Sequence, residues 1–85
     1  MIMKLYSIKD KLMEFTGPIA VKDDKVAVRM FDSFCASKKA QEYTESKYFD
    51  LYCIGEFDSE KGTIKGYEQS QLELIKEGEQ NEQTN

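Results

Sequence analysis

The chain has no histidine and no tryptophan, and only one proline and two cysteines among its 85 residues. Without histidine, no Ser-His-Asp or Cys-His catalytic site can form within the chain, and zinc sites that need imidazole are excluded. The two cysteines, Cys35 and Cys53, form no CxxC pair and lie within apolar stretches. This placement predicts buried, reduced thiols. A disulfide would require their Cα atoms to lie within about 7 Å of each other.

Long hydrophobic runs are also missing. No apolar stretch approaches the roughly 20 residues of a membrane-spanning helix. Lys4 and Lys9 interrupt the first ten residues too early for a secretory signal peptide. We therefore expect no membrane association and a reducing, intracellular setting.

Motifs for catalysis and for cofactors are absent as well. The five glycines form neither of the phosphate-binding patterns GxGxxG and GxxxxGK[ST]. The acidic segment 58–60 lacks the alternating spacing of a calcium loop and is better explained as a turn. A nucleophilic cysteine would need an activating base, and few are available. We predict that the chain is not an enzyme and that it binds no cofactor and no metal.

The net charge of −4 is unevenly distributed along the chain. Residues 1–47 carry +2, whereas residues 48–85 carry −6. Nucleic-acid phosphate repels an acidic chain overall, so DNA contact would need a local basic patch in the first half. Lys4 and Arg29 are candidates for such a patch, and ordinary solvated side chains are the alternative.

A helix following Asp23-Asp24 is the clearest predicted element. Either aspartate can cap its start, and it should end near Lys38-Lys39, whose charges suit the negative end of the helix dipole. An apolar stripe with a 3.6-residue period predicts a core-facing side rather than a cofactor site. The stripe comprises Val26, Ala27, Met30, Phe31, Phe34 and Cys35.

Two strands should precede this helix. Residues 2–9 alternate as a strand, but neither face is fully polar. Residues 12–21 predict a second, irregular strand that bends at Gly17-Pro18. Because proline has no N–H to donate, this strand should lie at a sheet edge. The two faces of the first strand are Met3, Leu5 and Ser7 on one side, and Lys4, Tyr6 and Ile8 on the other.

A hairpin should follow the helix. Residues 48–57 are the strongest predicted strand, and residues 58–62 form a loop that ends on Gly62, where a positive φ closes many hairpins. Residues 63–67 return as the paired strand, and residues 68–75 could add an edge strand or lie on the core. The core face of the long strand is expected to carry Phe49, Leu51, Cys53, Gly55 and Phe57.

These elements predict a single α+β domain over residues 1–75. Its order is β-β-α-β-β: an antiparallel sheet of about four strands, with one amphipathic helix on one face. Residues 76–85 contain no apolar side chain and cannot offset their ordering entropy by burial, so we expect a disordered polar tail.

One helix covers only one side of a sheet, and the other side should then be unusually apolar. Such a face favours association with a partner or with a second copy of the chain. Alternatively, its tyrosines could stack bases while nearby cations contact phosphate, or they could be ordinary surface tyrosines. The candidate partner or DNA surface comprises Tyr6, Ile8, Tyr48, Tyr52 and Ile54, together with Lys4 and Arg29.

Several short motifs, in this order, resemble one known family. They are Met-Lys-Leu-Tyr-Ser-Ile-Lys-Asp at 3–10, Gly17-Pro18, the segment 26–31, the segment 50–58, and Gly62. The chain is similar over residues 3–67 to the small nonstructural protein of gokushovirus-type microviruses, which are single-stranded DNA phages.

This resemblance implies a role in the cytoplasm of an infected bacterium. The family is commonly equated with microvirus protein C, which is linked to the switch from duplex DNA replication to single-strand synthesis and packaging. Expected partners are therefore the phage replication complex, the procapsid or viral DNA, and a homodimer is also open. The family offers no catalytic residues to transfer. The rival hypotheses are a direct single-stranded DNA-binding protein and a small dimeric module with no nucleic-acid role.

Overall fold

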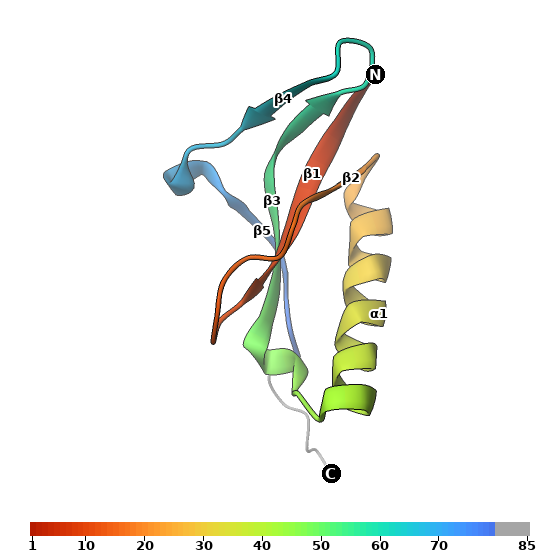
Figure 1. Ribbon diagram of the computed structural model, residues 1–85, viewed down its shortest axis with the longest axis vertical. Helices are drawn as coiled ribbons and strands as arrows, with labels where there is room; N and C mark the ends of the chain where they lie inside the picture. Colours follow the sequence, from red (N-terminus) through yellow and green to blue (C-terminus); the bar gives the residue numbers. More distant parts are fainter. Residues whose placement is uncertain (80–85) are drawn as a thin grey trace.

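The computed structural model describes residues 1–79, in which one helix packs against one face of an antiparallel sheet (Figure 1). The α+β class is confirmed, with five strands where about four were expected. The helix is α1 (Asp24–Glu42), and two short 3-10 turns are η1 (Ser46–Tyr48) and η2 (Gln69–Gln71). The strands are β1 (Ile2–Asp10), β2 (Ile19–Val21), β3 (Phe49–Asp58), β4 (Thr63–Gly66) and β5 (Glu73–Glu77).

β3 is the central strand of the sheet, whose order is β2-β1-β3-β4 with β5 also paired to β3. β1 pairs with β3 along its whole length. The opposite edge of β3 is shared, because β5 pairs with residues 50–53 and β4 with residues 55–58. The chain therefore leaves the sheet after β4, passes through η2, and returns to the same edge as β5 (Figure 1).

The start of α1 follows the expected capping. The Asp23 carboxylate accepts a hydrogen bond from the Val26 N–H at 3.0 Å, which satisfies one of the orphan donors of the first turn. The helix continues past the expected end at Lys38-Lys39 and closes at Tyr43, which has a φ of 56°. An ion pair between Lys38 and Glu42 at 3.1 Å stabilises this extra turn.

A β-bulge between β1 and β3 changes which side chains face the helix. Leu5 lies opposite Gly55, but the next residue, Tyr6, lies opposite Cys53, so Ile54 is an extra residue on β3. Cys53, before the bulge, faces α1. After the bulge, Glu56 lies on this same side of the sheet. Its position follows from its register partner Lys4, which forms an ion pair with Asp24 of α1. The alternation of β3 is therefore inverted beyond residue 54.

The bulge and the register correct two expectations about the core. Phe49, Leu51 and Cys53 face the helix as expected, whereas Gly55 and Phe57 turn to the opposite side. On β1 the two alternating sets are those expected, but Tyr6 and Ile8, not Leu5 and Ser7, lie on the helix side, because they are paired with Cys53 and Leu51. Both sets contain apolar residues, so the pattern alone did not distinguish them.

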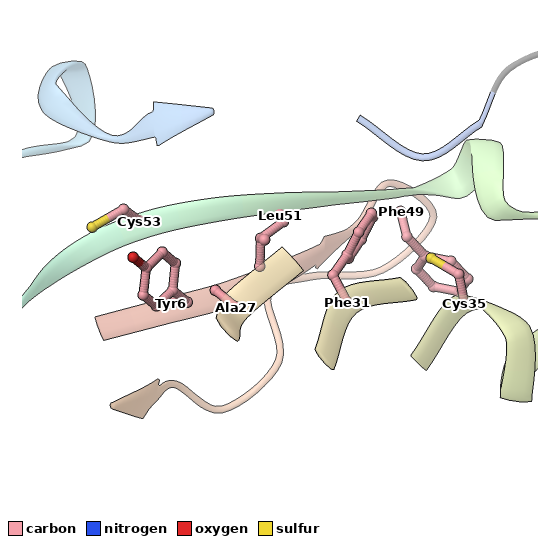
Figure 2. Packing of buried hydrophobic residues seen from close by; sticks show 7 residues of the cluster. All are labelled: Tyr6, Ala27, Phe31, Cys35, Phe49, Leu51 and Cys53. Carbon is pink, nitrogen blue, oxygen red and sulfur yellow. The ribbon is translucent and has the colours of Figure 1, made fainter. Parts of the chain in front are cut away.

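The core is a single cluster between α1 and the middle of the sheet (Figure 2). Rings, thiols and aliphatic groups from α1, β1 and β3 meet there, and Ile8, Phe34 and Ile75 pack around it. The rings of Phe34 and Phe49 meet edge to face with their centroids 5.1 Å apart. The buried cluster comprises Tyr6, Ala27, Phe31, Cys35, Phe49, Leu51 and Cys53.

The segment between β1 and α1 is less regular than a strand over residues 12–21. Only Ile19–Val21 pairs as β2, and an isolated bridge joins Phe15 to Lys9. β2 does lie at the sheet edge, directly after Pro18, as the missing N–H of proline requires. Gly62 closes the β3–β4 hairpin with a φ of 69°, as expected.

β5 extends the ordered domain beyond residue 75. Lys76 and Glu77 belong to this strand, and the Gly78 N–H donates to the Phe49 carbonyl at 2.7 Å. The polar segment starts within the sheet because its backbone pairs with β3 and the Lys76 side chain forms an ion pair with Asp32 of α1. The rest of the expected tail, residues 80–85, lies outside the described residues.

A substitution at Gly55 tests the close approach of β4 to β3. A Cβ at this position would collide with the backbone carbonyl oxygen of Lys65. We expect Gly55→Ala to lower the free energy of unfolding by about 1–3 kcal/mol, because backbone on both sides of the contact must move. Gly17→Ala is the matched control: nothing lies within 4 Å of its added Cβ, and its stability should stay within about 1 kcal/mol of the wild type. Equal urea midpoints for the two variants would contradict this arrangement.

Candidate partner-binding surface

Tyr6 is not part of a surface. Its side chain is fully buried between β1 and α1, and its hydroxyl donates a hydrogen bond to Asp24 Oδ1 at the start of the helix. This bond joins the sheet to the first turn of α1, where a carboxylate is also favoured by the helix dipole. Tyr6 therefore has a structural role, and the expectation that it lies on an open face is corrected.

The two candidate cations are also separated from the candidate tyrosines. Lys4 Nζ lies 3.6 Å from Asp24 Oδ1, so its charge is partly neutralised on the helix side of the sheet. Arg29 is exposed on α1, where it lines a shallow hollow with Val26 and Met30. A continuous basic and aromatic surface is therefore not formed by these residues.

The four remaining candidates lie in four different places. Ile8 is half-buried on the helix side. Tyr48 ends η1 with Lys47 Nζ 5.4 Å from the centre of its ring. Ile54 is the half-buried extra residue of the bulge. Tyr52 lies on the face opposite the helix, where its ring meets that of Phe15 edge to face with centroids 5.6 Å apart.

The register of the strands defines another apolar surface around Tyr52. Residues directly opposite each other on paired strands project to the same side of a sheet. Leu74 of β5 lies opposite Tyr52, and Ile64 of β4 lies opposite Phe57. Ile64 is 69% exposed and Leu74 is 47% exposed. We call this side the open face, and define it by Phe15, Tyr52, Phe57, Ile64 and Leu74.

Sequence reasoning missed most of the open face. Phe57 was assigned to the core because a bulge was not foreseen, and Phe15 was placed within a strand rather than beside Tyr52. A signal for Leu74 was present in the apolar group near the end of the chain. Its position opposite Tyr52, however, depends on the return of β5 to the edge of β3.

Ion pairs engage many of the cations in the part of the chain that the structure describes. Lys11 Nζ lies 3.6 Å from the buried carboxylate of Asp50, and Lys76 Nζ lies 2.8 Å from Asp32. Lys4, Lys38 and Lys47 also have carboxylate partners. Such pairs leave less positive charge available for phosphate.

Two tyrosines and one cysteine have raised pKa values, which favours their neutral forms. Burial, followed by the hydrogen bond to Asp24, raises the pKa of Tyr6 above its ordinary value. Burial and the hydrogen bond to Glu56 raise the pKa of Tyr67 to about 12. Burial also raises the pKa of the Cys53 thiol, which disfavours a reactive thiolate.

No histidine, cysteine or carboxylate side chains of residues 1–79 gather in groups of three or more that could hold a metal ion. No helix in the same range combines the length and apolar character that crossing a bilayer requires. Cys35 and Cys53 are both buried and form no disulfide bond with each other.

The raised tyrosine pKa values predict a loss of stability at high pH. The unfolded chain loses its tyrosine protons near pH 10, whereas folded Tyr67 keeps its proton up to about pH 12. The unfolded state therefore binds fewer protons in this window, and the free energy of unfolding falls as pH rises from 10 to 12. Tyr67→Phe should make this fall shallower. Urea titrations at several pH values check it, and parallel curves for the two proteins would contradict it.

A comparison with protein families matches residues 3–80 of the chain to the family described as Phage ORF5 protein. No curated protein and no solved structure matches the chain. The match covers almost the whole of the described domain, from β1 through β5. The chain therefore belongs to the phage ORF5 protein family.

Proposed function

We propose that this phage protein is the nonstructural accessory protein of a gokushovirus-type microvirus. In this proposal it acts in viral DNA synthesis and packaging, at the switch from replicative-form replication to single-strand synthesis. It works in the cytoplasm of the infected bacterium, mainly by contacting proteins of the replication complex or the procapsid. Membership in the phage ORF5 family and the motif order along residues 3–67 support this assignment.

The open face is the observation that carries the protein-contact mechanism. Its aliphatic side chains Ile64 and Leu74 are substantially exposed, and the Tyr52 ring packs against Phe15, with Lys9 Nζ 5.7 Å from the Phe15 ring centre. Aromatic and aliphatic groups arranged on a rigid sheet are typical of protein-binding surfaces. A partner that covered this face would remove apolar area from water at little entropic cost to the sheet.

A non-enzymatic role is part of the same proposal. Cys53, considered as a nucleophile, is fully buried beneath α1, and burial raises the pKa of its thiol. The buried carboxylate of Asp50 is engaged by Lys11 and by the Gly78 N–H at 3.4 Å. These groups support the fold, and neither is placed to act on a substrate in solution.

Direct binding of single-stranded DNA is the weaker alternative. Base stacking would need exposed tyrosine rings beside unneutralised cations. Tyr6 is buried, Lys4 is paired with Asp24, and Arg29 is on the helix rather than beside Tyr52. The net charge of −4 opposes the same interaction at long range.

Polar substitutions on the open face test the proposal. A tagged copy carrying Ile64→Gln and Leu74→Gln is expressed in infected cells in place of the wild type. We expect recovery of co-purifying replication-initiator and capsid proteins to fall at least about fivefold, because burying an Ile or Leu side chain contributes about 1.5–3 kcal/mol and about 1 kcal/mol corresponds to fivefold in affinity. The ratio of single-stranded to duplex viral DNA should fall with it.

Ile2→Gln is the matched control for this experiment. Ile2 is 57% exposed on the same sheet, but its register partner Asp58 places it on the helix side. The control should retain both the partners and the normal DNA ratio. An equal loss in the control and in the open-face variant, or no viral protein recovered with the wild type, would refute the proposal.

A further inference from the structure

Asp50 is the only charged residue in the described range 1–79 that is buried, with 7% of its surface exposed. It lies two residues before Tyr52 on β3 and therefore projects to the same open face. A buried carboxylate needs compensating partners, and two separate segments of the chain supply them. Lys11 Nζ lies 3.6 Å from Asp50 Oδ2, and the Gly78 N–H donates to Asp50 Oδ1 at 3.4 Å.

The first of these segments is a short hairpin after β1, residues 9–15, whose two ends are joined by an isolated bridge. The Lys11 N–H donates to the Tyr48 carbonyl at 2.9 Å, so the Lys11 backbone is held as well as its ammonium group. Phe15, at the end of the hairpin, packs on the ring of Tyr52. The position of the hairpin therefore determines one flank of the open face.

The second segment is the end of β5. The Gly78 N–H also donates to the Phe49 carbonyl at 2.7 Å, and a Cβ at position 78 would collide with the carbonyl oxygens of Ser46 and Phe49. Only glycine allows this close approach of two backbones. On the same strand, Leu74 lies opposite Tyr52. The hairpin and β5 thus reach the same ring from the two edges of β3.

A second carboxylate lies beside Asp50. Glu77 of β5 is its direct register partner, so both side chains project to the same side of the sheet. Like charges directly opposite each other destabilise the pairing of two strands, and the Lys11 ammonium offsets this repulsion. Lys9 is the register partner of Asp50 on β1, and its Nζ lies 5.7 Å from the Phe15 ring centre, beside the hairpin.

We propose that Asp50 is the positioning residue of the open face, because it couples the hairpin to the end of β5. With Lys11 in place, the buried charge is compensated and Glu77 is tolerated opposite it. When the hairpin moves away, Asp50 repels Glu77 and the end of β5 loosens. The coupling is reciprocal, so a partner that holds the hairpin also holds β5. Use of the open face by a partner rests on the proposed function, whereas the coupling is a property of the isolated chain.

Amide hydrogen exchange of the isolated full chain, followed by NMR, tests the coupling. In Lys11→Met, exchange of the Gly78 N–H should be at least about fivefold faster than in the wild type, because a buried carboxylate has lost its cation. The control amide is Gly62, which donates to the Asp58 carbonyl at 2.7 Å in the β3–β4 hairpin and should change by less than about twofold. Lys11→Arg keeps the charge and should leave both amides as in the wild type.

Glu77→Gln tests the mechanism by rescue. It removes the charge that Asp50 repels, so Lys11→Met should accelerate exchange at Gly78 at least about twofold less in this background than in the wild type. Asp50→Asn is a second variant that does not depend on the folding of Lys11→Met. Its neutral amide still offers an acceptor to the Gly78 N–H and does not repel Glu77, so exchange at Gly78 should stay within about twofold of the wild type.

Three results would overturn the coupling. The first is exchange at Gly78 that Lys11→Met leaves unchanged or raises only as much as exchange at Gly62. The second is an increase that Glu77→Gln does not reduce. The third is faster exchange at Gly78 in Asp50→Asn than in Lys11→Met. None of these measurements depends on recovery of viral proteins, so the coupling and the proposed function fail separately.

Discussion

The pairing of β1 with β3, and the bulge within it, is the constraint on which the rest of the structure depends. Placing Tyr6 opposite Cys53 and Leu5 opposite Gly55 leaves Ile54 without a partner in the register. This single extra residue brings Tyr6 beneath α1 and sends Phe57 to the opposite side. Because a one-residue shift moves every following side chain to the other face, the composition of both faces is determined here.

The two faces that result have different roles. The helix side is closed by the hydrogen bond from Tyr6 to Asp24, which fixes the start of α1 above the core. The open face has no comparable cover from α1, and its outer members Ile64 and Leu74 remain exposed. A domain of this size has too few residues to cover both faces of its sheet. One apolar face must therefore be stabilised by contacts outside the fold or remain in water.

The helix and the hairpin could be predicted from the sequence because their signals are local. Asp23 supplies the cap three residues before Val26, and Gly62 supplies the positive φ that closes the hairpin. The orientation of β1 could not be predicted in this way. Tyr6 and Leu5 are both apolar enough to be buried, and the choice between them depends on a register set by residues about 50 positions later. The residues of the open face could not be predicted either, because Phe57 lies on this face only as a result of the bulge.

For the same reason, the tyrosines and lysines of the sequence were a poor guide to which side chains form an exposed surface. Tyr6 and Lys4 share the Asp24 carboxylate and so contribute to a polar junction between helix and sheet. Tyr67 donates to Glu56 at 3.2 Å, and its ring packs against the core. Groups that could have bound bases and phosphates are instead used to hold a small fold together. What remains for recognition is the apolar open face, where exposed Ile64 and Leu74 lie beside aromatic rings. Such groups suit contact with other apolar protein surfaces, which supports the protein association that we propose.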